Sequence, residues 1–201
     1  MKLRRKTDKL IVIIIIIALG VFFLYSYKTY DRVTSDLEIN TPPQVIKYEY
    51  AETELPKSIQ IPSLNIDTTV KYVGVTKDGN MATPGNFKDV GWYKYGTAPG
   101  FNGSAVIAGH LDNALAISGV FKNLKLLKEG DDVYITRNDG TKLHFKVEKT
   151  ETYPYDNAPT EEIFNGNNGS RLNLITCAGV WNQLKKTYSK RLVVYAKLVN
   201  E

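Results

Sequence analysis

Residues 131–152 read DDVYITRNDGTKLHFKVEKTET, and this stretch decides the fold class. Two runs rich in Val, Ile, Tyr and Thr lie on either side of Asp139-Gly140, a pair typical of a tight turn between antiparallel strands. The stretch therefore predicts a β-hairpin with strands at 132–136 and 142–152.

The same pattern of short apolar runs separated by Gly, Asn, Asp and Pro continues on both sides of this hairpin. We expect further strands at 58–61, 69–75, 104–108, 172–176 and 192–199. One or two helical turns are expected within 120–128, where Val120, Leu124 and Leu127 would share a face. Many short strands with few helices predict a mainly β domain, either a closed barrel or a sandwich, over residues 57–201.

Composition narrows the range of functions. The 201 residues contain 26 Lys and Arg against 21 Asp and Glu, and a single Cys, which excludes an internal disulfide framework. Residues 1–27 hold five basic residues and one acid, so most of the net charge of +5 lies there and residues 28–201 carry only +1. Because residues 28–201 are nearly neutral, they lack the excess of basic residues that binds nucleic-acid phosphates, which argues against a nucleic-acid partner.

The amino-terminal segment predicts a membrane anchor. Residues 10–24 read LIVIIIIIALGVFFL, and Tyr25-Ser26-Tyr27 extend the uncharged run to about 27 Å of helix, close to the hydrocarbon thickness of a bilayer. The basic residues before the run place residues 1–9 in the cytoplasm, and the remainder of the chain outside the cell.

A cleaved signal peptide is the competing interpretation of this apolar run, but bulky tyrosines follow it where a small-residue cleavage site would be needed. We therefore expect an uncleaved single-pass transmembrane helix at 10–27. Residues 28–56 are polar, contain Pro42-Pro43, and are expected to form an extracellular stalk.

Four side chains near predicted strand ends are candidates for chemistry. Cys177 is either a buried small side chain or a nucleophile, and His110 is either structural or the proton-transfer group for that thiol. Arg191 could be a surface cation or an oxyanion-stabilising donor, and Asp112 could end a loop or orient the His110 imidazole. The other histidine, His144, alternates with apolar residues and is expected to be solvated and inert.

Several runs together resemble the sortase family over about residues 57–199, most closely class F and more loosely classes D and E. The runs that carry this resemblance are IPSLNID at 61–67, VGWY at 90–93, AGHLD at 108–112, and LNLITC at 172–177 followed by the arginine at 191.

The resemblance implies a closed eight-stranded sortase-type β-barrel on the outer face of a Gram-positive membrane. It also implies a cysteine transpeptidase that cleaves sorting signals similar to Leu-Pro-x-Thr-Gly and transfers the protein to a cell-wall amine. By the same resemblance, Cys177 is the nucleophile, His110 the general acid and base, and Arg191 the cationic stabiliser. Thr176 then matches a position that helps to bind substrate and oxyanion.

Two other functions remain open from the sequence. One is an anchored, non-catalytic β-module of the cell surface, and the other is a cysteine protease that uses water as the acceptor. No cofactor or metal is expected, since Glu161-Glu162, the one acidic pair considered for calcium, is expected to lie on a solvated loop.

Overall fold

The computed structural model describes residues 18–26, 49–112 and 118–199. Residues 18–26 are helical with exposed side chains. None of the helices in these three ranges combines the length and apolar character required to cross a bilayer. Half of the predicted anchor at 10–27 and most of the predicted stalk at 28–56 lie outside the described residues, so both stay predictions.

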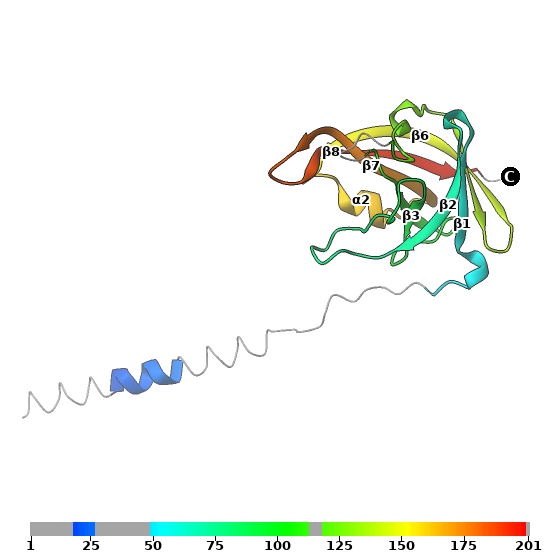
Figure 1. Ribbon diagram of the computed structural model, residues 1–201. Coiled ribbons are helices and arrows are strands. Elements are labelled where there is room, and N and C mark those ends of the chain that lie inside the picture. The colour runs from blue at the N-terminus through cyan, green and yellow to red at the C-terminus, as the bar shows by residue number, and fades with distance from the viewer. Residues whose placement is uncertain (1–17, 27–48, 113–117, 200–201) are drawn as a thin grey trace, which may run out of the picture. The chain divides into compact units, whose positions relative to one another are not determined.

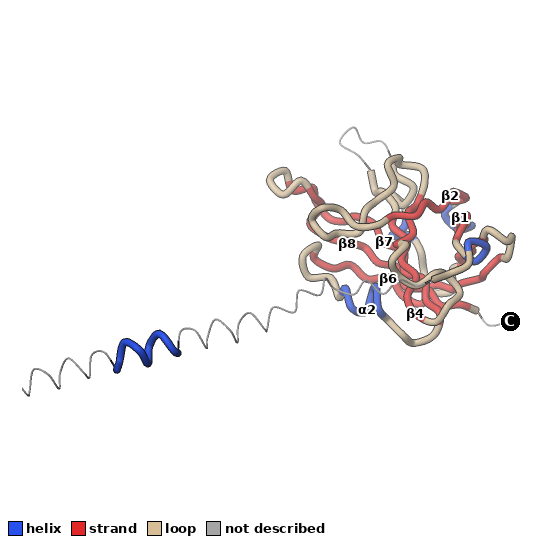
Figure 2. The backbone as a smooth tube through the Cα atoms, turned by 90° about the horizontal axis from the view of Figure 1, so that it is seen from below, coloured by secondary structure: helices blue, strands red, loops and turns tan. Residues whose placement is uncertain are grey.

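Eight strands close into a barrel in the order β1-β2-β3-β4-β7-β8-β6-β5, as Figures 1 and 2 show in two views. This confirms the closed barrel and excludes the sandwich. The strands are β1 (Pro56–Ile61), β2 (Ile66–Val73), β3 (Val90–Tyr93), β4 (Gly103–Ala108), β5 (Asp132–Arg137), β6 (Lys142–Pro154), β7 (Ser170–Asn182) and β8 (Thr187–Leu198).

The hairpin on which the fold prediction rests is confirmed. Strands β5 and β6 pair antiparallel with Val133 opposite Phe145. At the turn, Gly140 has a φ of 88°, a left-handed value that glycine adopts without strain, and the Asp139 carboxylate accepts a hydrogen bond from the Thr141 amide.

Two of the eight ladders are parallel, β2 with β3 and β4 with β7, and the other six are antiparallel. Strand β3 was not among the predicted strands, because its four residues form a short run without clear alternation. Its tryptophan, Trp92, is only 2% exposed and donates a hydrogen bond to the Thr97 carbonyl.

Short helices complete the barrel. The described part of the chain contains three 3-10 turns, at Glu52–Glu54, Pro62–Leu64 and Leu124–Leu126, and the last of them lies within the predicted 120–128 segment. The expectation of a loop at Glu161-Glu162 is wrong, because these residues form the first turn of helix α2 (Thr160–Asn165). Acidic side chains stabilise the amino end of a helix, and Glu162 also pairs with Lys149.

Alternation along the strands divides the apolar residues between two faces. The barrel interior contains even-numbered residues of β7 and β8, such as Leu172, Leu174 and Val194. The outer face of β4 and β8 carries a second cluster, in which Val106, Val193 and Tyr195 pack against Ile163 of α2. Helix α2 therefore covers the outside of the wall that β4, β7 and β8 form.

Polar contacts fix α2 on this wall. The buried Asn173 side chain donates a hydrogen bond of 2.6 Å to the Ile163 carbonyl, and Ser104 donates one to the Gly166 carbonyl at the end of the helix. Both donors lie on the same outer face as the apolar cluster.

Truncation of the α2 contact should destabilise the barrel. Ile163→Ala removes a side chain that is 2% exposed, and we expect it to lower the free energy of unfolding by about 2–5 kcal/mol. The exposed Glu161→Ala change in the same helix should cost less than about 1 kcal/mol. Equilibrium denaturation followed by Trp92 fluorescence measures both. Equal costs for the two variants would contradict the packing described here.

Candidate functional site

Three predicted site residues lie in one row across three adjacent strands. Cys177 of β7 pairs directly with Arg191 of β8. On the other side of β7, strand β4 is parallel and pairs Ala108 with Ile175. Continued by two residues in both segments, this register brings His110 level with Cys177. The backbone supports this continuation, since the Gly109 amide donates to the Ile175 carbonyl at 3.0 Å.

The same alternation places the three side chains on one face. In β4, β7 and β8 the interior positions include Ile107, Leu174 and Leu192. His110, Cys177 and Arg191 are each an odd number of residues away from these interior positions, so their side chains point to the outer face. They lie on that face just past the apolar cluster that α2 covers. Neighbouring strands lie about 4.8 Å apart, which brings imidazole, thiol and guanidinium within reach of one small ligand. The structure therefore brings the three together.

Cys177 is half-buried, and its surroundings act on the thiol in opposite directions. Burial raises the pKa of Cys177 and is the largest effect, the Arg191 guanidinium lowers it, and the Asp112 carboxylate raises it again. The net result is a raised pKa, so at neutral pH the resting group is mainly a thiol. Arg191 is the group that favours the reactive thiolate.

His110 is held by the loop between β2 and β3. Its Nε2 lies 2.9 Å from the Pro84 carbonyl oxygen, and its ring packs against the Phe87 ring at a tilt of 35°, with centroids 4.5 Å apart. Because a carbonyl oxygen only accepts, Nε2 carries a hydrogen, which leaves Nδ1 as the nitrogen that can gain and lose a proton.

Gly119 fits closely against the same residue, because an added Cβ would lie 2.1 Å from the His110 carbonyl oxygen. Only glycine leaves room there, and the next residue, Val120, donates its amide hydrogen to the Phe87 carbonyl at 2.8 Å, so this segment links the backbone of His110 to the Phe87 loop.

Arg191 is fixed within its own hairpin. One terminal nitrogen, Nη1, donates to the carbonyls of Tyr188 and Lys190, and Nη2 donates to the Thr187 hydroxyl at 2.9 Å. Its guanidinium also lies over the Tyr155 ring, 5.8 Å from the centroid. A cation held in this way needs little reorganisation to stabilise negative charge beside Cys177.

Asp112 has a different partner from the one expected. Its carboxylate accepts a hydrogen bond from the Tyr188 hydroxyl, while the imidazole of His110 is oriented by Pro84. The bond to Asp112 is the main reason that the pKa of Tyr188 is raised to about 12. Tyr188 therefore stays protonated and holds the carboxylate that acts on Cys177.

Thr176 faces away from the thiol. It is 3% exposed, and its hydroxyl donates a hydrogen bond of 2.8 Å to the Gly109 carbonyl. This bond links β7 to the residue before His110. The side chain thus positions the row from inside the barrel, and its role in binding substrate or oxyanion stays a prediction.

The second histidine lies on other strands. His144 of β6 contacts Asp132 of β5 at 2.7 Å and stacks on Tyr134. It is half-buried, which corrects the expectation of a solvated side chain; the cause is its pairing across the β5–β6 ladder. Hydrogen bonds from Lys146 and His144 lower the pKa of Asp132, so these residues form a polar cluster on the β5–β6 ladder.

Sequence reasoning missed three residues of the site: Pro84, Tyr155 and Tyr188. Each acts through contacts between distant parts of the chain, and no spacing within the sequence identifies them. Among residues 18–26, 49–112 and 118–199, no group of three or more His, Cys, Asp or Glu side chains is arranged to hold a metal ion.

Together, the closed barrel and the row of cysteine, histidine and arginine define a β-barrel protein with a cysteine-centred polar site. Comparison with known proteins gives the family: the sortase domain matches residues 59–199. The chain therefore belongs to the sortase family, whose members are cysteine transpeptidases, and it is an enzyme of that type.

Solved sortase structures share the fold. Sortase C-1 from Actinomyces oris is 23% identical with a TM-score of 0.59, and the match covers 82% of this chain and 85% of that one. Sortase C from Clostridium perfringens is 23% identical with a TM-score of 0.53, covering 75% and 73% of the two chains. Sortase A from Corynebacterium diphtheriae is 26% identical with a TM-score of 0.53, covering 75% and 63%.

A search of curated proteins found no match to this chain. The similar structures carry sortase class names A, C and D, so the likeness to class F seen in the sequence stays a prediction.

The opposing charges around Cys177 predict how fast the thiol is alkylated. Because only the thiolate reacts and its pKa is raised, the rate of alkylation by iodoacetamide should increase from neutral to alkaline pH. Arg191→Ala removes the effect that lowers the pKa and should slow alkylation at a given pH. Asp112→Asn removes an effect that raises it and should accelerate alkylation.

The pH profile of the rate for the single cysteine measures these changes, with exposed Lys190→Ala as the matched control. Faster alkylation of the Arg191→Ala variant would contradict the assignment of Arg191 as the group that favours the thiolate.

Proposed function

We propose that this sortase cleaves a sorting signal similar to Leu-Pro-x-Thr-Gly and transfers the resulting acyl group to a cell-wall amine. The observation that carries the proposal is the alignment of Cys177 on β7 with Arg191 on β8 and with His110, two residues beyond the end of β4. Each supplies one group that amide exchange requires: a nucleophile, a proton carrier and a fixed cation.

The first half-reaction forms a thioester on Cys177. The sulfur attacks the carbonyl carbon before the scissile amide, and the negative charge that develops on the carbonyl oxygen faces Arg191. His110 receives the thiol proton at Nδ1 and donates a proton to the departing amine, which would otherwise leave as a strongly basic anion. The Pro84 carbonyl holds the ring throughout, since it accepts from the other nitrogen.

The second half-reaction reverses these roles. An incoming primary amine attacks the thioester carbonyl, His110 removes its proton, and the sulfur leaves with Arg191 beside it. The product is a new amide, and the departing sulfur takes that proton back from His110, so the enzyme returns to its starting state with a Cys177 thiol. An amine outcompetes water when the site holds it against the thioester, so the choice of acceptor separates this proposal from a cysteine protease.

We also propose the location of the reaction. Residues 10–27 would anchor the chain in the membrane with residues 1–9 in the cytoplasm, and residues 57–201 would act outside the cell. The charge distribution of the first 27 residues supports this orientation. A non-catalytic surface module is disfavoured by the family membership and by the alignment of the three side chains.

Mass spectrometry of the full chain with a Leu-Pro-x-Thr-Gly peptide tests the chemistry. We expect an acyl adduct on Cys177 and none on Cys177→Ala. His110→Ala should slow adduct formation by about 10²–10⁴-fold, and Arg191→Ala by about 10²–10³-fold. The matched controls are His144→Ala, which removes the other histidine, and Lys190→Ala.

Addition of a glycine peptide to the same reaction distinguishes the acceptors. Transpeptidation yields an amide product at the expense of hydrolysis, whereas a protease yields the same hydrolysis with or without the amine. An adduct on a residue other than Cys177, or normal turnover by Cys177→Ala, would overturn the assignment of the nucleophile.

A further inference from the structure

Strands β7 and β8 extend beyond the barrel as a hairpin, which projects at the left of Figure 1. Three of its side chains are large, apolar and exposed within five residues: Val180 at 72%, Trp181 at 51% and Leu184 at 95%. The reaction described above uses only the base of this hairpin, where Cys177 pairs with Arg191. The tip is left without an assigned role.

The hairpin tip is ordered by its own hydrogen bonds. The Asn182 side-chain oxygen accepts from the amides of Leu184 and Lys185, and Lys186 takes a positive φ of 50°. Trp181 packs edge-on against Tyr188 at 5.3 Å. The turn is therefore ordered and exposes Leu184 to solvent together with Val180 and Trp181. An exposed apolar patch of this kind marks a surface that contacts a partner or a membrane.

The base of the hairpin is attached to the rest of the barrel. The Tyr155 amide donates to the Ser189 carbonyl, and Lys185 donates to the Tyr155 hydroxyl at 2.9 Å. The tip and the site thus belong to one supported element, and a contact at the tip would orient the site.

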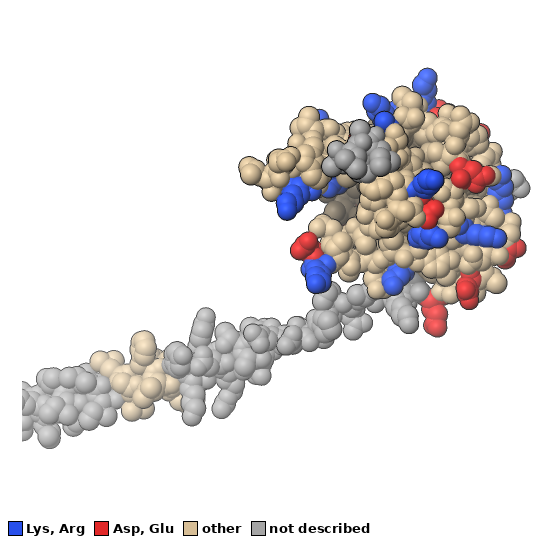
Figure 3. Space-filling model, viewed as in Figure 1, with Lys and Arg blue, Asp and Glu red and all other residues tan. Residues whose placement is uncertain are grey.

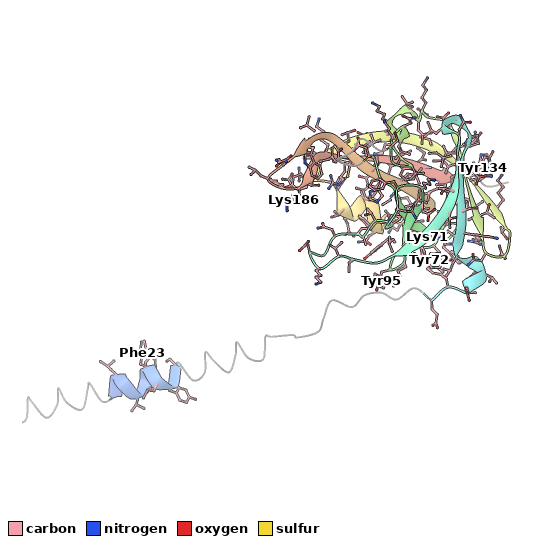
Figure 4. The ribbon with its side chains drawn as sticks, viewed as in Figure 1. Phe23, Lys71, Tyr72, Tyr95, Tyr134 and Lys186 are labelled. Carbon is pink, nitrogen blue, oxygen red and sulfur yellow. The ribbon has the colours of Figure 1, made fainter. Side chains whose placement is uncertain are left out.

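The charge of the hairpin selects the kind of partner. Residues 177–191 contain Lys185, Lys186, Lys190 and Arg191 and no acidic residue. Figure 4 labels Lys186 on this hairpin, and Figure 3 shows basic side chains on the projecting lobe beside a hollow in the surface. The neighbouring Asp156 acts on Lys185 and offsets part of this charge.

We propose that the β7–β8 hairpin tip docks onto an anionic lipid surface, with Val180, Trp181 and Leu184 in the interface and the lysines toward the head groups. Tryptophan beside lysine and aliphatic residues is a combination suited to the lipid–water boundary. Each lysine near such a surface contributes about 1 kcal/mol, or roughly fivefold in occupancy.

The proposal rests on the membrane anchor proposed above. The first 3-10 turn beside the barrel begins at Glu52 and Tyr50 packs against the core, so the tether at 28–48 reaches at most about 75 Å even when fully extended, and an anchored barrel stays near the bilayer. At that effective concentration a weak contact of a few side chains suffices for docking. Docking would hold the site toward the membrane and favour substrates that are themselves attached to it.

The two tryptophans of the chain allow a direct test, because Trp92 is 2% exposed inside the barrel and Trp181 is exposed on the hairpin. The full chain is reconstituted in vesicles of phosphatidylcholine with brominated acyl chains, with or without phosphatidylglycerol. We expect quenching of tryptophan fluorescence that requires phosphatidylglycerol and disappears in Trp181→Ser.

Charge variants sharpen this test. Lys185→Gln combined with Lys186→Gln should reduce the ratio of docked to free hairpin on the order of 30-fold, because each lysine contributes a factor of about five. The matched control is Lys71→Gln combined with Lys142→Gln, two exposed lysines on β2 and β6, which should leave quenching unchanged.

The outcomes separate this proposal from the anchor and from the chemistry. A chain that floats with vesicles but shows no quenching in either lipid, or equal quenching in both, overturns docking and leaves the anchor intact. A chain that does not float overturns both. Protection of Trp181 by a sorting-signal peptide or by a second copy of the chain, without any effect of lipid, also overturns docking. Cys177→Ala should quench like the parent, because docking does not need catalysis.

Discussion

The site depends on the pairing of β7 with a strand on each side. Its antiparallel pairing with β8 places Arg191 opposite Cys177, and its parallel pairing with β4 brings His110 level with the same residue. A slip of one residue in either ladder would turn one of these side chains to the barrel interior. Residues that fix the registers, such as Thr176 with its bond to Gly109, therefore matter to the chemistry although they face away from it.

The environment of Cys177 favours a resting thiol over a resting thiolate. Burial and the Asp112 carboxylate raise its pKa, and Arg191 opposes them only in part. For an unpaired cysteine proposed to lie outside the cell, this protects the sulfur, because oxidation and disulfide exchange proceed through the thiolate. The same arrangement makes activation depend on a proton acceptor at the right moment. His110 lies level with Cys177 two residues beyond the end of β4, and the Pro84 carbonyl accepts from its Nε2, so Nδ1 is the nitrogen left to accept the thiol proton.

The sequence predicts those parts of the molecule that are set by local chemistry. Turn residues and alternating apolar runs predict the β5–β6 hairpin and most strands, and the ends of two apolar runs indicate His110 and Cys177. The parallel register of β4 and β7 joins residues 67 positions apart, as in the Thr176–Gly109 bond, and no local pattern specifies it. For the same reason the Pro84 carbonyl and the Tyr188–Asp112 bond could not be predicted. Helix α2 was missed because six residues are too few to show helical periodicity.

A hairpin that contains both half of the site and an exposed apolar tip combines two demands that usually conflict. Reaction geometry requires a rigid element, whereas a surface that meets a membrane benefits from freedom to adapt. Here the rigidity is concentrated where it serves both: Tyr155 and Ser189 fix the base, and Asn182 fixes the turn. Between them the ladder is interrupted after Ala178, before pairing resumes at Trp181. An irregularity at that point turns the tip relative to the barrel wall. It lies beyond Cys177 and Arg191, and the hydrogen bond from Lys185 to the Tyr155 hydroxyl ties the tip back to the base, so a contact made at the tip is passed to the paired cysteine and arginine.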